Sequence, residues 1–410
     1  MTYDVVVVGG GPSGMMAAGR AAERGLQVLL LEKNPSLGKK LLITGKGRCN
    51  ITNDQDDLRD FVSVYGKNGP FLFSVFHKFS SIDTMRFFED RGLELKVERG
   101  KRVFPASDRS ADVLKVLQDY LKFNGVEIKY NAAVKKINFS KNKIDSLILF
   151  SGESIKANHY ILACGGLSYP ATGSDGDALP WLRELGHNLI PVKPALVPII
   201  CAEKWIRNLA GISLKNVNIS VWSENKKVDE RFGEALFTHE GMSGPIILDM
   251  SKKIGQLLES SQVKISIDFK PALSFPELDL RLLKEIEEKG KQAAPRFFLS
   301  LLPGKLAEQF MVLLNFDQNR KVLSINKDER KEILHLLKDF PLVVKKLAPV
   351  DEAIVTSGGV DLSEIDPRTL RSKLYDNLSV VGELLDLDGP TGGYNLQVAW
   401  STGYVAGEGV

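Results

Sequence analysis

Cysteine is scarce in this chain of 410 residues, which holds only Cys49, Cys164 and Cys201. The three lie far apart and form no Cys-x-x-Cys pair. That spacing argues against a disulfide framework, a zinc ribbon and a dithiol redox centre, and no metal site is expected. Reduced thiols are expected instead, and with them a cytoplasmic location.

Long apolar runs and a strong charge of one sign are also missing. No apolar segment is long enough to cross a bilayer, so no membrane association is expected. The N-terminus enters a strand at Asp4 without the basic start and apolar region of a secretory signal, so the mature protein is expected to begin here. The net charge is only +3, which gives no support to a nucleic-acid partner.

The first 32 residues predict a βαβ unit. Residues 4–8 are a β-branched run typical of a buried parallel strand, 15–24 a helix of small residues, and 27–32 a second strand. The turn at 9–14 matches G-x-G-x-x-G, and a helix start behind it favours phosphate. A carboxylate closing the second strand suits ribose hydroxyls. A dinucleotide site, FAD or NAD, is therefore predicted at Gly9, Gly11, Pro12, Ser13, Gly14 and Glu32.

A second signature stands at the other end of the chain. A strand at 377–381 runs into Gly382-Glu383, and Thr391-Gly392-Gly393 opens a final helix of small residues, 395–406. The acid can hold a ribityl chain or a phosphate-bound water. The helix start can face the flavin edge that becomes negative on reduction. NAD needs no such distant second element, so the pair of signatures favours FAD.

The sequence between these ends predicts an insertion. Helices are expected at 81–91 and 110–123, and strands at 126–130, 134–139, 146–150 and 160–164. From about residue 191 to 270 polar and apolar residues alternate, as in antiparallel strands of a small barrel. Residues 274–340 are charged and helical, with helix starts at Ser274 and Asn326. The predicted domains are 1–192 with 348–410, an inserted barrel at 193–270, and an inserted helical domain at 271–347.

Three long blocks, together with the closing Gly-Glu and Gly-Gly-Tyr-Asn segments, carry a family resemblance. The blocks are residues 38–53, 163–174 and 233–245. Over nearly the whole length the chain resembles the BaiN/YhiN-type flavoproteins, which include aminoacetone-oxidase-like members. One departure is Lys46, where the family usually has glycine. The resemblance implies an α/β fold: a glutathione-reductase-like Rossmann FAD domain with an inserted antiparallel β-barrel and a small helical domain.

The resemblance also places further residues at the cofactor. The loop 47–50 would lie along the pyrophosphate and flavin, Val134 would bind adenine through its backbone, and 163–166 would line the cofactor. An arginine suits oxyanions, and Lys40 could add attraction for phosphate. The expected cofactor residues beyond the first turn are Lys33, Lys40, Gly47, Arg48, Cys49, Asn50, Val134, Ala163, Gly165, Gly166, Gly382, Glu383, Asp386, Gly393, Tyr394, Asn395 and Leu396.

Candidate chemical groups remain open at two places. Cys49 is either a redox thiol or flavin attachment point, or a buried structural thiol, and the absence of a second nearby cysteine favours the structural reading. Thr238 and His239 lie in a glycine-rich segment of the insertion, which is expected to cover the flavin. His239 would then act on the substrate as an acid, a base or a hydrogen-bond donor; the alternative is a structural histidine.

The predicted function is an FAD-dependent oxidoreductase acting on a small organic substrate. An NAD(P)H-dependent reductase and an amine-type oxidase passing electrons to oxygen are both open. The insertion holds no second G-x-G-x-x-G, so NAD(P)H would be a transient donor at the flavin. An RNA-modifying flavoprotein and a non-catalytic FAD-binding protein are the remaining alternatives. The sequence leaves the oligomeric state open.

Overall fold

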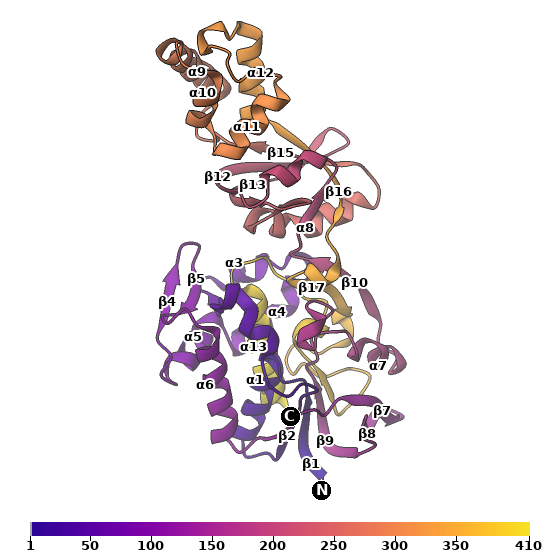
Figure 1. Cartoon of the computed structure of the whole chain (residues 1–410). Coiled ribbons are helices and arrows are strands. Elements are labelled where there is room, and N and C mark those ends of the chain that lie inside the picture. The colour runs from indigo at the N-terminus through magenta and orange to yellow at the C-terminus, as the bar shows by residue number, and fades with distance from the viewer. Residues whose placement is uncertain (1) are drawn as a thin grey trace. The chain divides into compact units, whose positions relative to one another are not determined.

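A computed structural model describes residues 2–410, in which the chain forms two compact units. The first contains Met1–Ala195 and Val350–Val410, and the second is the inserted stretch Leu196–Pro349. Both ends of the chain therefore build one unit, as the colours in Figure 1 show. The separation of the insertion into a barrel domain and a helical domain stays a prediction.

A seven-stranded mixed sheet forms the centre of the first unit. Strand β1 pairs in parallel with β2 and with β9, and β18 from the end of the chain pairs in parallel with β9. Residues 5–8 of β1 are all buried, as expected for a β-branched strand covered on both faces. In sheet order the strands are β6 (Glu127–Lys129), β2 (Val28–Leu31), β1 (Thr2–Val8), β9 (Ser154–Leu162), β8 (Lys143–Leu149) and β7 (Val134–Ser140), with β18 (Leu378–Val380) beside β9.

The described part of the first unit also contains eight α-helices. Helix α6 has the predicted bounds and buries one apolar face. Helix α1 begins three residues earlier than expected, because Pro12 in the glycine turn occupies its first position. The helices are α1 (Pro12–Glu23), α2 (Lys39–Ile43), α3 (Leu58–Ser63), α4 (Gly69–Lys78), α5 (Ser81–Glu89), α6 (Ser110–Phe123), α7 (Ala178–Glu184) and α13 (Tyr394–Gly409).

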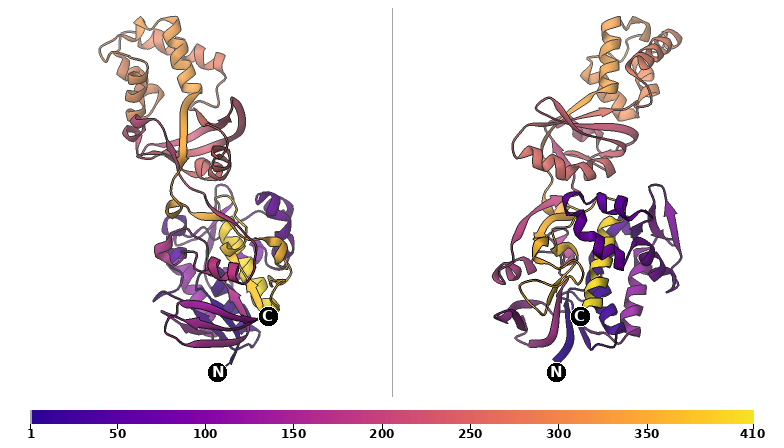
Figure 2. Two further views of the ribbon diagram at one scale, coloured as in Figure 1. Left: turned by 90° about the vertical axis from the view of Figure 1, so that its right-hand side faces the viewer. Right: turned by 180° about the vertical axis from the view of Figure 1, so that it is seen from behind.

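The last helix, α13, packs directly on the first, α1. Figure 2 shows the yellow C-terminal helix among the indigo and purple N-terminal elements. A Cβ atom at Gly403 would lie 2.3 Å from the Ser13 carbonyl oxygen, and one at Gly407 would lie 2.5 Å from that of Ala17. Because only glycine permits so close a backbone approach, the small residues of α13 allow the last helix to pack tightly against the first.

Two smaller sheets complete the first unit. One has three antiparallel strands, β3 (Thr52–Asn53), β5 (Arg102–Pro105) and β4 (Leu95–Glu98). The other pairs β10 (Leu189–Ala195) with β17 (Val355–Val360), the strands on either side of the insertion. The insertion thus leaves and returns through neighbouring strands, which lets a folded unit be accommodated there.

The second unit contains a closed six-stranded barrel. Its neighbouring strands are antiparallel, and buried side chains alternate along β15 and β16, as in a barrel with a filled interior. In barrel order the strands are β11 (Ile199–Cys201), β14 (Gly241–Ser243), β13 (Lys226–Phe237), β12 (Ser213–Ser223), β15 (Val263–Asp268) and β16 (Phe340–Leu347).

Two elements of the second unit differ from the predicted pattern. Residues 245–258, expected within the strand segment, form helix α8, whose Ile246, Met250 and Ile254 are buried at helical spacing. Residues 340–347, expected in the helical segment, form the strand that closes the barrel. The helices are α8 (Pro245–Leu258), α9 (Phe275–Lys289), α10 (Ala294–Leu301), α11 (Gly304–Leu313) and α12 (Lys327–Lys338).

The predicted helix starts at Ser274 and Asn326 are confirmed. Each side chain accepts from the backbone three residues on, and Glu277 or Glu329 bonds back to the cap, so both are complete capping boxes. The fold class is confirmed as well, with a Rossmann unit, a closed antiparallel barrel and a group of helices.

Candidate functional site

The glycine turn between β1 and α1 is shaped partly by its own packing. Gly9 has a φ of +107°, and a Cβ there would lie 2.5 Å from the Ala163 carbonyl oxygen. A Cβ at Gly14 would lie 1.8 Å from the carbonyl oxygen of Gly9. The fold itself therefore requires glycine at both positions, since a side chain would force the turn away from β9 and α1.

Gly11 differs, because neither backbone strain nor a close contact requires glycine at this position. Its φ of −80° suits any residue, and no atom lies within 4 Å of the position of a Cβ. It caps α1 without a side-chain hydrogen bond, and Pro12 follows as the first helical residue. The start of α1 thus offers backbone N–H groups and a partial positive charge to an open space. This arrangement fits a diphosphate that approaches the backbone closely.

Glu32 stands at the end of β2 beside this turn. It is 7% exposed, and its Oε2 accepts from the Gly10 N–H at 2.8 Å. Its Oε1 accepts from the backbone and side-chain N–H groups of Asn34, each at 2.8 Å. The carboxylate is therefore fixed next to the phosphate turn, where the ribose of a dinucleotide would lie. The neighbouring Lys33 instead pairs with two aspartates of the 170–177 segment, Asp175 and Asp177.

The Gly-Glu segment from the end of the chain meets the same turn. Gly382 has a φ of +68°, and a Cβ there would lie 2.6 Å from the Ser13 hydroxyl. It opens the short 3₁₀ helix η8 (Gly382–Leu384), which follows β18. The two signatures separated by more than 360 residues in sequence are thus adjacent at one edge of the sheet. At the carboxyl ends of parallel strands, this edge is the usual place for a dinucleotide.

Glu383 is the centre of a polar network in this position. Its Oε2 accepts from Lys40 Nζ at 2.8 Å, and its Oε1 accepts from the Thr356 N–H at 2.8 Å and hydroxyl at 3.1 Å. Ser168 contributes a further hydroxyl at 3.2 Å and also accepts from Lys40. Burial pushes the pKa of Glu383 upward, but Lys40 and the Thr356 donors outweigh it and hold the pKa below its ordinary value.

The loop 44–50 joins the final helix through backbone contacts. With its amide oriented to satisfy its neighbours, Asn50 accepts from the Gly393 N–H at 3.0 Å. A Cβ at Gly393 would lie 2.3 Å from the carbonyl oxygen of Thr52 in β3, so the start of α13 rests directly on the strand that follows this loop. Gly47 and Cys49 both have positive φ, which gives the loop its tight path.

Cys49 is fully buried in that loop. Burial raises the pKa of its thiol to about 12, so the thiolate needed for redox chemistry does not form near neutral pH. This supports the structural reading of the residue. Arg48 lies over the Phe104 ring at 4.1 Å and pairs with Glu98 and Asp108. Its charge is thus matched within the protein, whereas the sequence suggested contact with a phosphate or the flavin.

The other expected cofactor residues fall into two groups. Backbone positions include Val134, which opens β7, and Ala163, which follows β9, with the turn of Gly165 and Gly166 behind it. Several side chains in the last segment instead bind their own neighbourhood. Asp386 accepts from Asn68 and Gly358, Asn395 closes the 389–390 loop, Tyr394 packs on Phe61, and Leu396 lies partly buried against the core.

Thr238 and His239 occupy the turn between β13 and β14 in the second unit. The Thr238 backbone donates to the Gly241 carbonyl at 2.9 Å, and its hydroxyl accepts from the Gly241 N–H at 3.1 Å. Thr238 therefore stabilises the turn itself. His239 is exposed at the tip. Its role toward a substrate stays a prediction.

Two residues of the polar network were not expected from the sequence. Ser168 and Thr356 are 0% and 1% exposed and bind the Glu383 carboxylate together. Ser168 lies in one of the long family blocks, which was the available signal. Thr356 lies on β17 after the insertion, where no local pattern distinguishes it.

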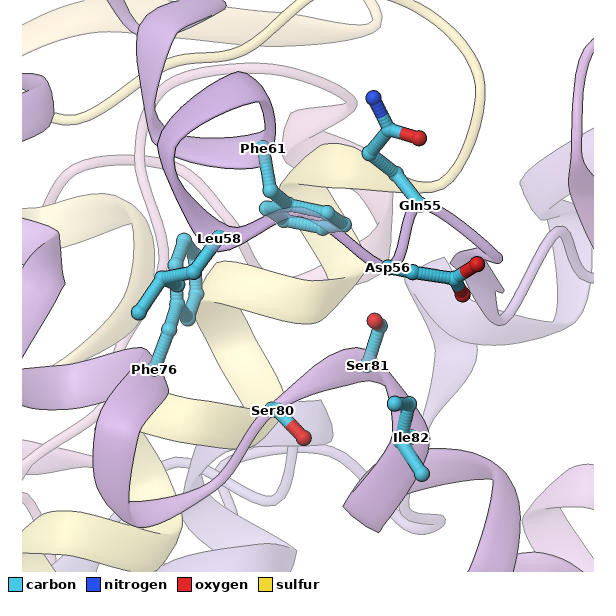
Figure 3. A pocket seen from close by; sticks show the side chains of 8 residues that line it. All are labelled: Gln55, Asp56, Leu58, Phe61, Phe76, Ser80, Ser81 and Ile82. Carbon is cyan, nitrogen blue, oxygen red and sulfur yellow. The ribbon is translucent and has the colours of Figure 1, made fainter.

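A small hollow lies elsewhere in the first unit, between the 55–58 segment and helices α3, α4 and α5. Figure 3 shows the rings of Phe61 and Phe76 on one side and Ser80, Ser81 and Ile82 on the other. It shares no lining residue with the expected cofactor site. Over residues 2–410, no group of three or more His, Cys, Asp or Glu could hold a metal, and no helix is long and apolar enough to cross a membrane.

Known proteins resemble the chain along almost its whole length. The family model for the HI0933-like protein Rossmann domain matches residues 3–409. A 3-dehydro-bile acid delta(4,6)-reductase from Clostridium scindens is 32% identical over 404 residues, 98% of this chain and 97% of that protein. A ribosomal RNA dihydrouridine synthase from Escherichia coli is 26% identical over 412 residues, 99% of this chain and 97% of that protein.

Solved structures resemble the fold. A flavocytochrome c3 fumarate reductase in its open conformation has a TM-score of 0.53 and 16% sequence identity, covering 100% of this chain and 78% of its own. At this identity the likeness concerns the fold alone.

Proposed function

The chain belongs to the HI0933-like family of FAD-binding Rossmann proteins, and from this premise we propose that it reduces a carbon–carbon double bond conjugated to a carbonyl in a small organic substrate. The family resemblance drawn from the sequence is confirmed, and so is an FAD-dependent oxidoreductase. The double bond, the small substrate and the electron donor are the parts that are proposed.

The observation that carries the cofactor site is Gly11. The fold accounts for glycine at positions 9 and 14 but not at 11, where the conformation is ordinary and the space is open. Apart from its modest advantage over alanine as the cap of α1, glycine there is explained by a ligand that approaches the backbone. Because Gly382 rests on Ser13 of the same turn, a bound FAD would be held by both ends of the chain.

Support for reduction of a conjugated double bond comes from the relatives. A full-length relative is named a delta(4,6)-reductase of a 3-dehydro bile acid, in which the double bonds are conjugated to the 3-keto group. Bound FAD supplies the hydride chemistry for such a reaction. The residues of this chain would hold the diphosphate at the start of α1, the ribose at Glu32, and the flavin end beside the start of α13.

A second candidate is the same reaction on RNA. The relative named for dihydrouridine also covers nearly the whole chain, and dihydrouridine arises by reducing a double bond conjugated to a carbonyl. The net charge of +3 gives this candidate little support, because RNA binding draws on a strongly basic face. The absence of a nucleic-acid partner therefore stays a prediction, to be tested by salt-dependent binding to ribosomal RNA.

The test begins with the electron donor. Purified protein loaded with FAD is mixed without oxygen with NADH, and separately with NADPH, while the oxidised flavin absorbance is followed. Fast bleaching is expected for an NAD(P)H-dependent reductase. Failure of both donors, together with bleaching by a small amine, would replace the reductase with an amine-type oxidase.

The acceptor is tested next, on the reduced protein. An unsaturated 3-keto steroid, an unmodified ribosomal RNA fragment and buffer alone are added, and return of the oxidised flavin band is timed. Recovery with the steroid supports the proposal, and recovery only with RNA favours the second candidate. Recovery with neither, after efficient NAD(P)H reduction, would contradict reduction of conjugated double bonds in both substrates.

A further inference from the structure

The ion pair between Lys40 and Glu383 is shielded and joins distant parts of the chain. The Lys40 side chain is 22% exposed and that of Glu383 18%, and their charged atoms are 2.8 Å apart. Lys40 belongs to α2 and Glu383 to η8 at the other end of the sequence. Exposed ion pairs contribute little to the free energy of folding. Removing the partner of a shielded carboxylate is costly, because it leaves a charge without compensation away from water.

The two carboxylate oxygens of Glu383 differ in how many hydrogen bonds they accept within the protein. The backbone and the hydroxyl of Thr356 donate to Glu383 Oε1, and the single proton of the Ser168 hydroxyl is shared between this oxygen and the Ile354 carbonyl, each 3.2 Å away. Among residues 2–410, Oε2 accepts a hydrogen bond from Lys40 alone. A carboxylate oxygen accepts two hydrogen bonds, so Oε2 has room for one further donor, such as a hydroxyl of a ligand.

The position of the pair places it at the cofactor edge. Glu383 directly follows Gly382, which contacts Ser13 at the start of α1. A Cβ at Gly166, in the turn after β9, would lie 2.9 Å from Glu383 Oε1. The carboxylate is therefore next to both the phosphate turn and the segment expected to line the cofactor. An unbalanced negative charge at this place would repel a diphosphate.

We propose that Lys40 is a positioning residue for FAD. It balances the charge of Glu383 and aims Oε2 at the cofactor, so that the carboxylate accepts a cofactor hydroxyl without opposing the phosphates or the reduced flavin. This inference rests on FAD occupying the first unit. It predicts that the sign of the charge left behind decides the effect of each substitution.

Lys40→Met leaves the carboxylate unbalanced. We expect it to weaken FAD binding about tenfold or more and to lower the flavin midpoint potential, because the negative charge opposes both the diphosphate and the electron-rich reduced flavin. Glu383→Gln leaves the ammonium unbalanced and is expected to raise the potential. Lys40→Arg keeps the charge and is expected to restore most of the FAD affinity.

The experiment is a double-mutant cycle on the full chain. FAD dissociation constants are measured by fluorescence on reconstituting apoprotein, and midpoint potentials by dye equilibration. In the Glu383→Gln background, Lys40→Met is expected to cost FAD affinity much less than it does alone. Equal losses in both backgrounds, or equal potentials in the two single variants, would overturn the proposal. Lys115→Met and Asp119→Asn, which remove one partner each from an exposed pair on α6, are the charge-matched controls.

Two other results, a failure of the protein to bind FAD and a failure of a variant to fold, can be distinguished from a failure of this proposal. If the unaltered protein binds no FAD, the proposed cofactor fails, independently of Lys40. If Lys40→Met does not fold, Glu383→Gln decides the question against Asp119→Asn. A midpoint potential that Glu383→Gln leaves unchanged would then refute a charge balance at the cofactor.

Discussion

Gly11 and Gly14 lie three residues apart in one turn, yet the structure predicts opposite consequences for replacing each with alanine. At Gly11 the added methyl group enters open space on a backbone that alanine adopts freely. At Gly14 the methyl carbon would lie 1.8 Å from the Gly9 carbonyl oxygen. Gly11→Ala should therefore affect the ligand, and Gly14→Ala the fold.

The magnitudes follow from these contacts. For Gly11→Ala, the lower flexibility of the unfolded chain favours folding by roughly 0.4–1 kcal/mol, and the poorer cap at the start of α1 offsets it, so the free energy of unfolding stays within about 1 kcal/mol. A methyl group in the place of a phosphate costs about 3 kcal/mol in overpacking, which weakens FAD binding roughly 100-fold. Gly14→Ala should lower the free energy of unfolding by about 3 kcal/mol.

The assay compares apoproteins and their reconstitution. Urea unfolding of flavin-free protein gives the stability of each variant, and titration with FAD gives its dissociation constant. Because the apoprotein contains no ligand, its unfolding midpoint isolates the effect on the fold. If apo Gly11→Ala were as unstable as Gly14→Ala, or if it bound FAD with unchanged affinity, then Gly11 would have an internal role and the argument for a phosphate at this place would be wrong.

Three further predictions concern buried groups. Cys49, with its pKa raised to about 12 by burial, should resist iodoacetamide at pH 8 in the folded protein and react once the protein is unfolded, which mass spectrometry can follow. Lys338→Met should lower the stability of the second unit by about 3 kcal/mol, measured by urea unfolding, because it leaves Asp268 and two backbone carbonyls without their shared partner. Burial lowers the pKa of His159 to about 3, below its unfolded value of about 6.5. The unfolded chain then binds the extra proton, so the free energy of unfolding should fall as pH drops below about 6.5, and His159→Asn should reduce that slope.

The elements that the sequence predicts well are those whose causes are local. The βαβ unit, α6 and the capping boxes each depend on residues within one or two turns, and all were found in place. The barrel contains a strand that local sequence does not predict. Strand β16 alternates buried Phe340, Leu342 and Val344 with more exposed residues, but it follows directly on α12, and the sequence places it in the helical segment. Its identity as a strand depends on pairing with β15 and β11.

The same limit explains which parts of the site the sequence could locate. Glycine is needed where the backbone takes a special conformation or where two segments approach closely, and both are local properties. A motif of six residues is therefore enough to place the turn between β1 and α1. The role of a charged side chain depends on its partners, and here the partners are far away in the sequence. Lys33 pairs with Asp175, 142 residues later, and Lys40 pairs with Glu383, 343 residues later.

The sequence predicts both Lys33 and Lys40 at the cofactor, with attraction for phosphate at Lys40, whereas in the folded chain each lysine has a carboxylate partner. The two partners differ in what they leave open. Asp175 and Asp177 together neutralise Lys33, while Glu383 retains an acceptor position at the cofactor edge. A positive residue near a nucleotide turn therefore cannot be given the role of a phosphate ligand from its charge alone. Its effect on the cofactor depends on the charge that remains once its protein partner is counted.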